Sequence, residues 1–330
     1  MPAGTADIDS AMRYRLVPLF AATGLAAITA AAAVPARASQ AVTDTNATSV
    51  SLAVNAKGEA LLTYTRANGT VRHVLAWGAI NANAPVEAGL VPQVQFRWDY
   101  AGGWGKYRNG SYWKTFRNAC KPYDGPQLPF LVAACKAPDG TYWAVQQWQR
   151  LLPLLGFDAW KPEQLAYETH LSHWSGPLPQ LEVYAHWTYG GEYQGVFGRF
   201  TYLGNPVHGF SSTSDGNPHD RYGRNVFIDT YNSAYGPGWR RESGILTHSP
   251  NGTFCHSFVP QKPFPGYPSD AIRPPAPGEK YRFTVMGPGV TPVVSVEIPG
   301  LTAADRQSSS SIDQVWDSVM AGDARCAPER

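Results

Sequence analysis

Short stretches in which apolar and polar residues alternate make up most of this chain, and turn-forming residues separate them. Three such stretches lie within residues 49–77, divided by Asn55–Gly58 and by Asn68–Gly69. Asn-Gly between two alternating stretches is a strong β-hairpin signal, because both central positions of the tight turn need a positive φ. The pattern predicts an antiparallel meander. Asn68, Asn109 and Asn251 each begin an Asn-Gly-Ser/Thr sequence that also matches a glycosylation acceptor, and we favour the hairpin because Gly follows each of them.

The same alternation, with a period of two, recurs through the rest of the chain. Val94, Phe96 and Trp98 share one face of a stretch over residues 93–99. Further stretches cover residues 141–148, 181–189, 196–203, 226–231, 281–285 and 292–298. Such alternation is typical of antiparallel sheets with one apolar face. We therefore predict a mainly β, turn-rich fold with antiparallel sheets in a sandwich-like arrangement, and we find no fixed-period repeat that would indicate a propeller.

The period changes to that of a helix only near the C-terminus. Ser311 is of a residue type that caps helices, and Ile312, Val315, Trp316 and Val319 fall on one helical face. The sequence predicts one short C-terminal helix after a serine-rich linker.

Two prolines interrupt the alternating pattern in residues 175–179. The interruption indicates a domain boundary. The predicted parts are a β-meander and aromatic-rich domain, a second β-rich domain, and a linker with the C-terminal helix, covering residues 39–178, 179–299 and 300–330. A single large sandwich with a loop at this position is the alternative.

Residues 1–38 have the features of a secretory signal peptide. Two arginines precede the uncharged residues 16–34, and Ala36-Arg37-Ala38 matches the small-x-small pattern of a signal-peptidase site. An uncleaved membrane anchor is the alternative, but a proline and a glycine lie inside the uncharged stretch. Because the signal is rich in alanine, we expect a bacterial protein that is secreted or held in the cell envelope, with no stable membrane span after cleavage.

The composition narrows the classes of function. The 27 basic and 25 acidic residues leave a net charge of +2, and no basic run occurs, which argues against a nucleic-acid partner. With 43% apolar residues the chain can bury a core, so it is not a disordered protein. Aromatic residues make up 12% of the chain, whereas the charged fraction of 16% is well below the roughly 25% of ordinary soluble domains.

Four cysteines form an even set, as expected of an exported protein. Three pairings are open. Cys120 and Cys135 flank the turn-forming residues 123–126, so we predict a local disulfide between them, which leaves Cys255 with Cys326. The chain has no Cys-x-x-Cys sequence, so a structural zinc site is not indicated.

Aromatic residues gathered within residues 98–113 are candidate ligand-binding groups. They are Trp98, Tyr100, Trp104, Tyr107, Tyr112 and Trp113. Flat rings stack against the faces of sugars, and the neighbouring Gly102 and Gly103 let a ligand approach the backbone. Polysaccharide or another cell-surface component is therefore the predicted partner. The alternative is that some of these rings belong to the core, since Trp98 shares a face with Phe96.

Three histidines are candidates for a metal site. His170 and His173 are three positions apart, a spacing that suits one face of a helix, and His186 follows in the next predicted strand. The segment lacks the His-Glu-x-x-His order that would make the signal specific. We therefore predict no metal and no cofactor.

His208, His219, Asp220 and Asp229 are candidate catalytic residues. Imidazole and carboxylate groups gathered in one short segment are what general acid–base catalysis needs. No Gly-x-Ser-x-Gly elbow is present, and the Asn, Asp and Ser residues of this segment are also favoured in turns.

Two functions follow from these features. We expect an exported β protein that binds envelope carbohydrate or another extracellular surface partner through exposed aromatics. A secreted hydrolase that uses the His/Asp cluster is the alternative, and the sequence does not decide whether the chain is an enzyme. Solvent-facing rings in residues 98–113 favour binding, whereas a cleft joining His208 or His219 to a carboxylate favours hydrolysis.

Overall fold

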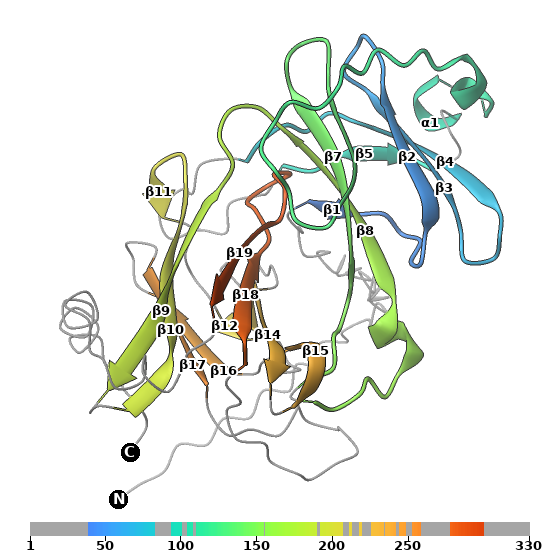
Figure 1. Cartoon of the computed structure of the whole chain (residues 1–330). Helices are drawn as coiled ribbons and strands as arrows, with labels where there is room; N and C mark the ends of the chain where they lie inside the picture. The colour runs from blue at the N-terminus through green and yellow to red at the C-terminus, as the bar shows by residue number, and fades with distance from the viewer. Residues whose placement is uncertain are drawn as a thin grey trace, which may run out of the picture. The chain divides into compact units, whose positions relative to one another are not determined.

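The computed structural model describes much of the chain between residues 39 and 299 (Figure 1). The described residues are 39–82, 94–100, 104–107, 110–154, 156–189, 192–206, 211–212, 218–219, 226–233, 235–241, 244–248, 253–258 and 278–299. The predicted signal peptide and the predicted C-terminal linker and helix lie outside them.

The first sheet is the meander that the N-terminal alternation predicts. It contains, in spatial order, the antiparallel strands β2 (Thr48–Val54), β3 (Ala60–Thr65), β4 (Val71–Trp77) and β5 (Arg97–Asp99). Gly58 and Gly69 lie in the two hairpin turns with φ of 73° and 81°, a conformation that glycine adopts without steric cost. The prediction of a meander is confirmed.

The second sheet shares a core with the first. Its strands, in spatial order, are β1 (Gln40–Ala41), β8 (Tyr167–Trp174), β7 (Tyr142–Gln149) and β6 (Leu131–Lys136). The buried residues of this core include Val54, Leu62, Tyr64, Val74, Trp143, Val145 and Leu171. One prediction is wrong here: His170 and His173 do not share a face of a helix, because both residues lie in β8, a strand that pairs with β7 along its whole length.

The second half of the chain forms two further sheets and a short ribbon. One sheet has the order β11 (Asn205–Pro206), β10 (Glu192–Tyr202), β17 (Thr253–Phe258) and β16 (Gly244–His248), and β9 (Gln180–Tyr189) also pairs with β10. The other has the order β15 (Gly236–Arg241), β14 (Val226–Ser233), β18 (Lys280–Val285) and β19 (Val294–Pro299). The ribbon pairs β12 (Ser211–Ser212) with β13 (Pro218–His219). A second core includes Phe200, Val226, Ile228, Phe254, Tyr281, Phe283 and Val285.

The connection between β18 and β19, residues 286–293, is buried and reaches the second sheet. The backbone amide of His173 donates to the carbonyl of Val290 at 2.9 Å. Gln146 bonds Val293 twice: its side-chain oxygen accepts from the Val293 amide at 3.0 Å, and its Nε2 donates to the Val293 carbonyl at 3.1 Å. These bonds tie the hairpin of β18 and β19 to β7 and β8.

A disulfide joins Cys120 to Cys135 with Cα atoms 5.5 Å apart, which confirms the predicted local pairing. Cys255 lies in β17, opposite Phe197 of β10, and Cys326 lies outside the described residues, so their pairing stays a prediction.

The described helices are short. They are α1 (Trp104–Tyr107) and the 3-10 turns η1 (Tyr112–Thr115) and η2 (Pro162–Leu165). Within the described stretches no helix has the length and apolar character needed to cross a bilayer. The mainly β, antiparallel class is confirmed, whereas the sandwich-like arrangement and the domain boundaries stay predictions.

Candidate ligand-binding pocket

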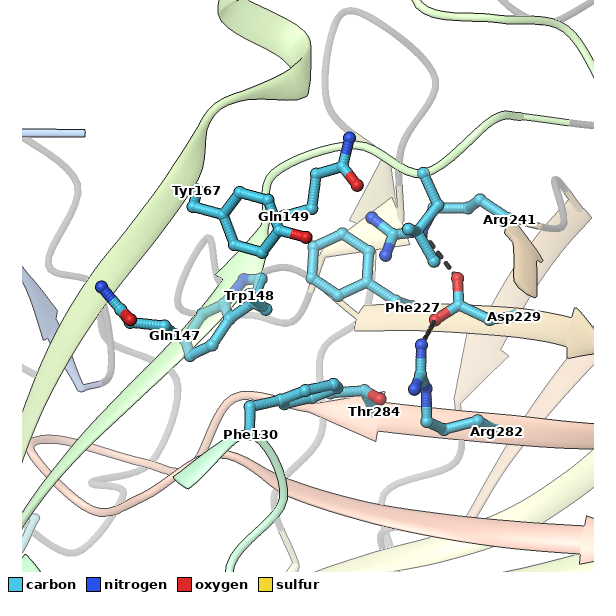
Figure 2. Close-up of a pocket in the computed structure, with 11 residues that line it drawn as sticks. Phe130, Gln147, Trp148, Gln149, Tyr167, Phe227, Asp229, Arg241, Arg282 and Thr284 are labelled. Carbon is cyan, nitrogen blue, oxygen red and sulfur yellow. Dashed lines mark hydrogen bonds and ion pairs between the residues drawn. The ribbon is translucent and has the colours of Figure 1, made fainter. Parts of the chain in front are cut away.

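A cavity of about 170 Å³ lies between β7, the start of β8 and the sheet that contains β14, β15 and β18 (Figure 2). The described residues that line it are Phe130, Gln147, Trp148, Gln149, Leu152, Tyr167, Phe227, Asp229, Arg241, Arg282 and Thr284. Pockets that enclose a drug-sized ligand hold roughly 300–1,000 Å³. This cavity therefore suits a single ring or the end group of a larger molecule.

The alternation of side chains along two strands supplies one wall of the cavity. On β14, Asp229 lines the cavity while Ile228 packs in the second core, and on β18 Arg282 lines it while Phe283 packs in that core. Successive side chains of a strand point to opposite faces of the sheet, so the polar members of both strands gather on the same side. The cavity lies on the face of this sheet that is opposite to its core.

A carboxylate held between two guanidinium groups forms the polar part of this wall. Asp229 is the cross-strand partner of Arg241 on β15 and of Arg282 on β18. Its Oδ1 accepts from Arg241 Nε at 2.9 Å, and its Oδ2 accepts from Arg282 Nη2 at 2.9 Å (Figure 2). Only 2% of the Asp229 side chain is exposed. Directly opposite residues of antiparallel strands lie close enough for such pairs, so the strand register produces this triad.

Both guanidinium groups also lie over aromatic rings. Arg241 lies 3.9 Å from the ring centre of Phe227, and Arg282 lies 5.0 Å from that of Phe130. Arg282 is also 4.2 Å from the ring centre of Trp239. A cation at this distance is attracted by the negative face of the ring, which helps to hold the two arginines in place.

The end of β15 is attached to the segment that follows β7. The amide of Arg241 donates to the carbonyl of Pro153 at 2.8 Å, and its Nη1 donates to the carbonyl of Arg150 at 3.3 Å. These bonds fix Arg241 from both its backbone and its side chain, and they link β15 to the segment that follows β7.

The aromatic wall on the β7 side is Trp148, which is supported from behind by an ion-pair network around Glu168. Its ring stacks on His170 with centroids 3.8 Å apart. His170 Nε2 lies 3.1 Å from Glu168 Oε2, and Arg150 Nε donates to Glu168 Oε1 at 2.7 Å. Burial raises the pKa of Glu168, but the hydrogen bonds and charges of His170 and Arg150 outweigh it and hold the pKa at about 2. The Glu168 carboxylate is therefore ionised at neutral pH.

Tyr167 is the exposed member of the lining. This side chain is 51% exposed, whereas Trp148, Phe227 and Asp229 are buried. Figure 2 shows the Tyr167 hydroxyl directed toward the ring of Phe227. The ring of Tyr167 is thus accessible to a ligand that enters the cavity.

The predicted catalytic residues are only partly described. Asp229 lies in the cavity, where its two oxygens accept hydrogen bonds from arginines. The backbone of His219 pairs with Ser211 in the β12–β13 ribbon, and His208 and Asp220 lie outside the described residues. The hydrolase hypothesis therefore stays a prediction.

Within the predicted aromatic site, Tyr107 and Tyr112 stack with centroids 4.1 Å apart and bind a buried carboxylate that the sequence analysis missed. Glu59 accepts hydrogen bonds from Lys106, Tyr107 and Tyr112, and also from Asn55 Nδ2 at 2.8 Å. Burial raises the pKa of Glu59, and the hydrogen bonds from Lys106, Tyr107 and Asn55 outweigh it, so that its pKa lies below the ordinary value. These two rings contact each other and Glu59, and ligand binding by them stays a prediction.

The other members of the predicted aromatic site also contact rings. Trp98 and Tyr100 are stacked at 6.0 Å between centroids, and Trp113 stacks on His73 at 3.9 Å. Trp104 lies in α1, and nothing of its side chain is described. One face of these stacked rings is covered by a neighbour, so binding by this segment stays a prediction.

The histidines of β8 are bound to backbone and side-chain groups rather than gathered at a metal. Their separation by three positions in a strand places them on opposite faces. His170 Nδ1 donates to the carbonyl of Ser39 at 2.9 Å, and His173 Nε2 lies 2.9 Å from Thr141 Oγ1. The described residues contain no group of three metal-ligating side chains, and only the backbone of His186 is described, in β9.

Among the described residues that were predicted as catalytic or ligand-binding, Asp229 is the one that lines the cavity. It was predicted because it lies in one short segment with His208, His219 and Asp220. Arg282, a charged residue within the predicted stretch 281–285, was not among the predicted site residues. No protein-family model, curated protein or solved structure matches this chain.

Proposed function

We propose that this protein is exported and binds carbohydrate of the cell envelope or of another extracellular surface, without catalysing a reaction. The observation that carries the proposal is the cavity, because four aromatic side chains and several planar hydrogen-bonding groups line it together. The aromatic residues are Phe130, Trp148, Tyr167 and Phe227. The proposed site is thus this cavity rather than residues 98–113.

The chemistry of the lining suits a sugar ring. The C–H faces of a pyranose pack against aromatic rings, and its hydroxyl groups accept and donate hydrogen bonds at the edge of the ring. Trp148 and Tyr167 offer aromatic surface, while Arg241 and Gln149 offer donors, and Gln149 also offers an acceptor. A volume of about 170 Å³ supports a site for one ring of a longer glycan whose other units extend past Tyr167.

The state of Asp229 supports binding over catalysis. Each oxygen of this carboxylate accepts a hydrogen bond from an arginine, so one lone pair of each oxygen is occupied and is not available to a general base. Hydrolysis of a glycosidic bond ordinarily needs two carboxyl groups on opposite sides of that bond. Among the described lining residues, Asp229 is the one carboxylate.

The test is binding of a panel of soluble neutral and acidic polysaccharides, measured by affinity electrophoresis and calorimetry. Tyr167→Ala is expected to weaken the binding about two- to tenfold, the factor that corresponds to one aromatic stacking contact. The melting temperature is expected to change little, because Tyr167 is 51% exposed.

Two control variants locate the site. Trp160→Ala removes an aromatic ring that is 40% exposed and does not line the cavity, and it is expected to leave binding unchanged. Trp113→Ala tests the segment of residues 98–113. If Trp113→Ala abolishes binding and Tyr167→Ala does not, the cavity is the wrong site. If the wild-type protein binds no member of the panel, the proposed function is wrong.

A further inference from the structure

We propose that the bound sugar is acidic, and that its carboxylate binds to the free N–H groups of Arg241 and Arg282. This inference rests on the proposed carbohydrate binding and names the chemical class of the ligand. It depends on the charge of the cavity, on the burial of that charge and on the hydrogen-bonding capacity that the two arginines retain.

The described residues that line the cavity carry a surplus positive charge. Arg241 and Arg282 are cations, and Asp229 is the one anion among them. The side chains of Arg241 and Arg282 are only 7% and 13% exposed, so water screens the surplus charge poorly. A buried charge without a counter-charge is costly, and an anionic ligand removes that cost.

Two acids near the cavity in the described part of the chain already have other partners. Glu168, behind Trp148, binds Arg150 and His170. Glu297, opposite Arg282 on β19, binds Lys280 at 2.9 Å. Neither carboxylate is therefore available to balance the charge of the two arginines.

A second Arg–Asp–Arg triad in the same chain has arginines that are more exposed than those of the cavity. Asp44 binds Arg66 Nε and Arg72 Nη1, each at 3.1 Å, so it has the same stoichiometry as Asp229. The side chains of Arg66 and Arg72 are 33% and 28% exposed, so water solvates their extra charge. Neither of these arginines lines the cavity. The Asp44 triad therefore needs no further anion, and it supplies a matched control.

The two arginines of the cavity retain donors that Asp229 does not use. A guanidinium group has five N–H donors. Arg241 donates from Nε to Asp229 and from Nη1 to the Arg150 carbonyl, while Arg282 donates from Nη2 to Asp229. Arg282 Nε is buried without a hydrogen-bond partner, and so is the Oγ1 of Thr284, two residues further along β18.

A guanidinium group offers the donor geometry that a carboxylate requires. Two parallel N–H groups of a guanidinium match the two oxygens of a carboxylate, and such charge-assisted bonds are stronger than bonds to a neutral hydroxyl. A sugar acid also carries the pyranose ring that the aromatic residues of the cavity suit. A uronic acid unit therefore fits both parts of the lining.

The test compares acidic oligosaccharides with their neutral counterparts. Trisaccharides of galacturonic, glucuronic and mannuronic acid are each titrated into the wild-type protein beside the same trisaccharide with its carboxyl groups reduced to hydroxymethyl groups. At least one acid is expected to bind about ten- to a hundredfold more tightly than its reduced form, with a preference that falls as salt is added. This comparison needs no variant.

Variants then place the preference at the arginines. Arg282→Gln is expected to remove most of the preference for the acid, whereas Arg72→Gln, at the Asp44 triad, is expected to retain it. Arg282→Lys keeps the positive charge but loses the two parallel N–H groups of the guanidinium, and it is expected to give an intermediate preference for the acid. Thermal melting of each variant verifies that it is folded.

The outcomes separate this inference from the proposal on which it rests. If the reduced trisaccharides bind as tightly as the acids, the inference of an acidic ligand is wrong and carbohydrate binding stands. The same inference is overturned if folded Arg282→Gln keeps the full preference. If neither the acids nor their reduced forms nor any polysaccharide of the panel binds, carbohydrate binding itself fails.

Discussion

Acidification from pH 7 toward pH 4 is expected to destabilise the fold through one buried side chain, His173. Its ring stacks on Trp143 with centroids 3.8 Å apart. Nδ1 bonds the carbonyl of Ala79, which can only accept, so Nδ1 carries the proton of the neutral ring. Nε2 lies 2.9 Å from the hydroxyl of Thr141, which donates its one proton to Asp139 Oδ1 at 2.8 Å. A second proton on the ring places a charge inside the core.

The pKa of His173 gives the magnitude of this effect. Burial lowers it to about 4, against the opposing effects of the Ala79 hydrogen bond and the Asp139 charge. An unfolded chain binds this proton near pH 6.5. Because the folded-state pKa lies below the unfolded one, the contribution to stability is complete above about pH 6.5 and is lost as the pH falls toward 4. The full loss is about 3 kcal/mol, of which about 2 kcal/mol appears between pH 7 and pH 4.5.

The assay is the free energy of unfolding, measured by urea titration at several pH values from 7 to 4.5, for the wild type and for His173→Asn. Asparagine keeps an N–H group for the Ala79 carbonyl but does not titrate. The variant loses the stacking on Trp143 at every pH, so the slope against pH and not the absolute stability is the relevant quantity. The wild type is expected to lose about 2 kcal/mol more than the variant over this range.

A matched substitution, His73→Asn, isolates the effect of burial. His73 also has a lowered pKa, caused by burial, but it is only half-buried and lies at the Trp113 stack. Its removal is expected to change the slope much less. If His173→Asn shows the same dependence on pH as the wild type, or if a nuclear magnetic resonance titration finds the His173 ring protonated at pH 6, the argument from burial is refuted.

Two further predictions concern other buried or covalent links. Glu168 has a pKa of about 2, below the usual value of 4.5, so its contribution of about 3 kcal/mol to stability is present above pH 4.5 and is lost as the pH falls toward 2. In urea unfolding, Glu168→Gln is therefore expected to cost about that much at pH 7 and much less at pH 2.5. An equal cost at both pH values would contradict this prediction. The Cys120–Cys135 disulfide closes a loop of 15 residues, so the double Cys→Ala variant is expected to lose about 3 kcal/mol of stability, and an unchanged urea midpoint would exclude this contribution. Peptide mapping without reductant tests the predicted pair of Cys255 and Cys326.

The strands of the N-terminal meander and several later strands were readable in the sequence because their signals are local. A period of two marks a strand wherever one face is apolar, and Asn68–Gly69 marks a hairpin because few other residues accept a positive φ. The Cys120–Cys135 pairing was accessible for the same reason, since the intervening turn is short. None of these features requires knowledge of residues far away in the chain.

The histidines of β8 show where local reasoning fails. The spacing of His170 and His173 fits one face of a helix, but residues 167–174 form a strand because β7 supplies hydrogen-bond partners along its whole length. Their side chains are buried against Trp148 and Trp143, which a sequence cannot place there. Tertiary pairing therefore overrides the local pattern.

The candidate site was decided almost wholly by tertiary structure. The sequence offered Asp229 as one carboxylate of a His/Asp cluster, and it indicated neither the partners of this residue in the fold nor the aromatic residues around it. Strand register places Asp229 opposite Arg241 and Arg282, and the buried connection of residues 286–293 holds their sheet against β7, which carries Trp148. Alternation along a strand depends only on neighbouring residues. This cavity forms where two sheets meet, and that arrangement depends on contacts between segments distant in the sequence.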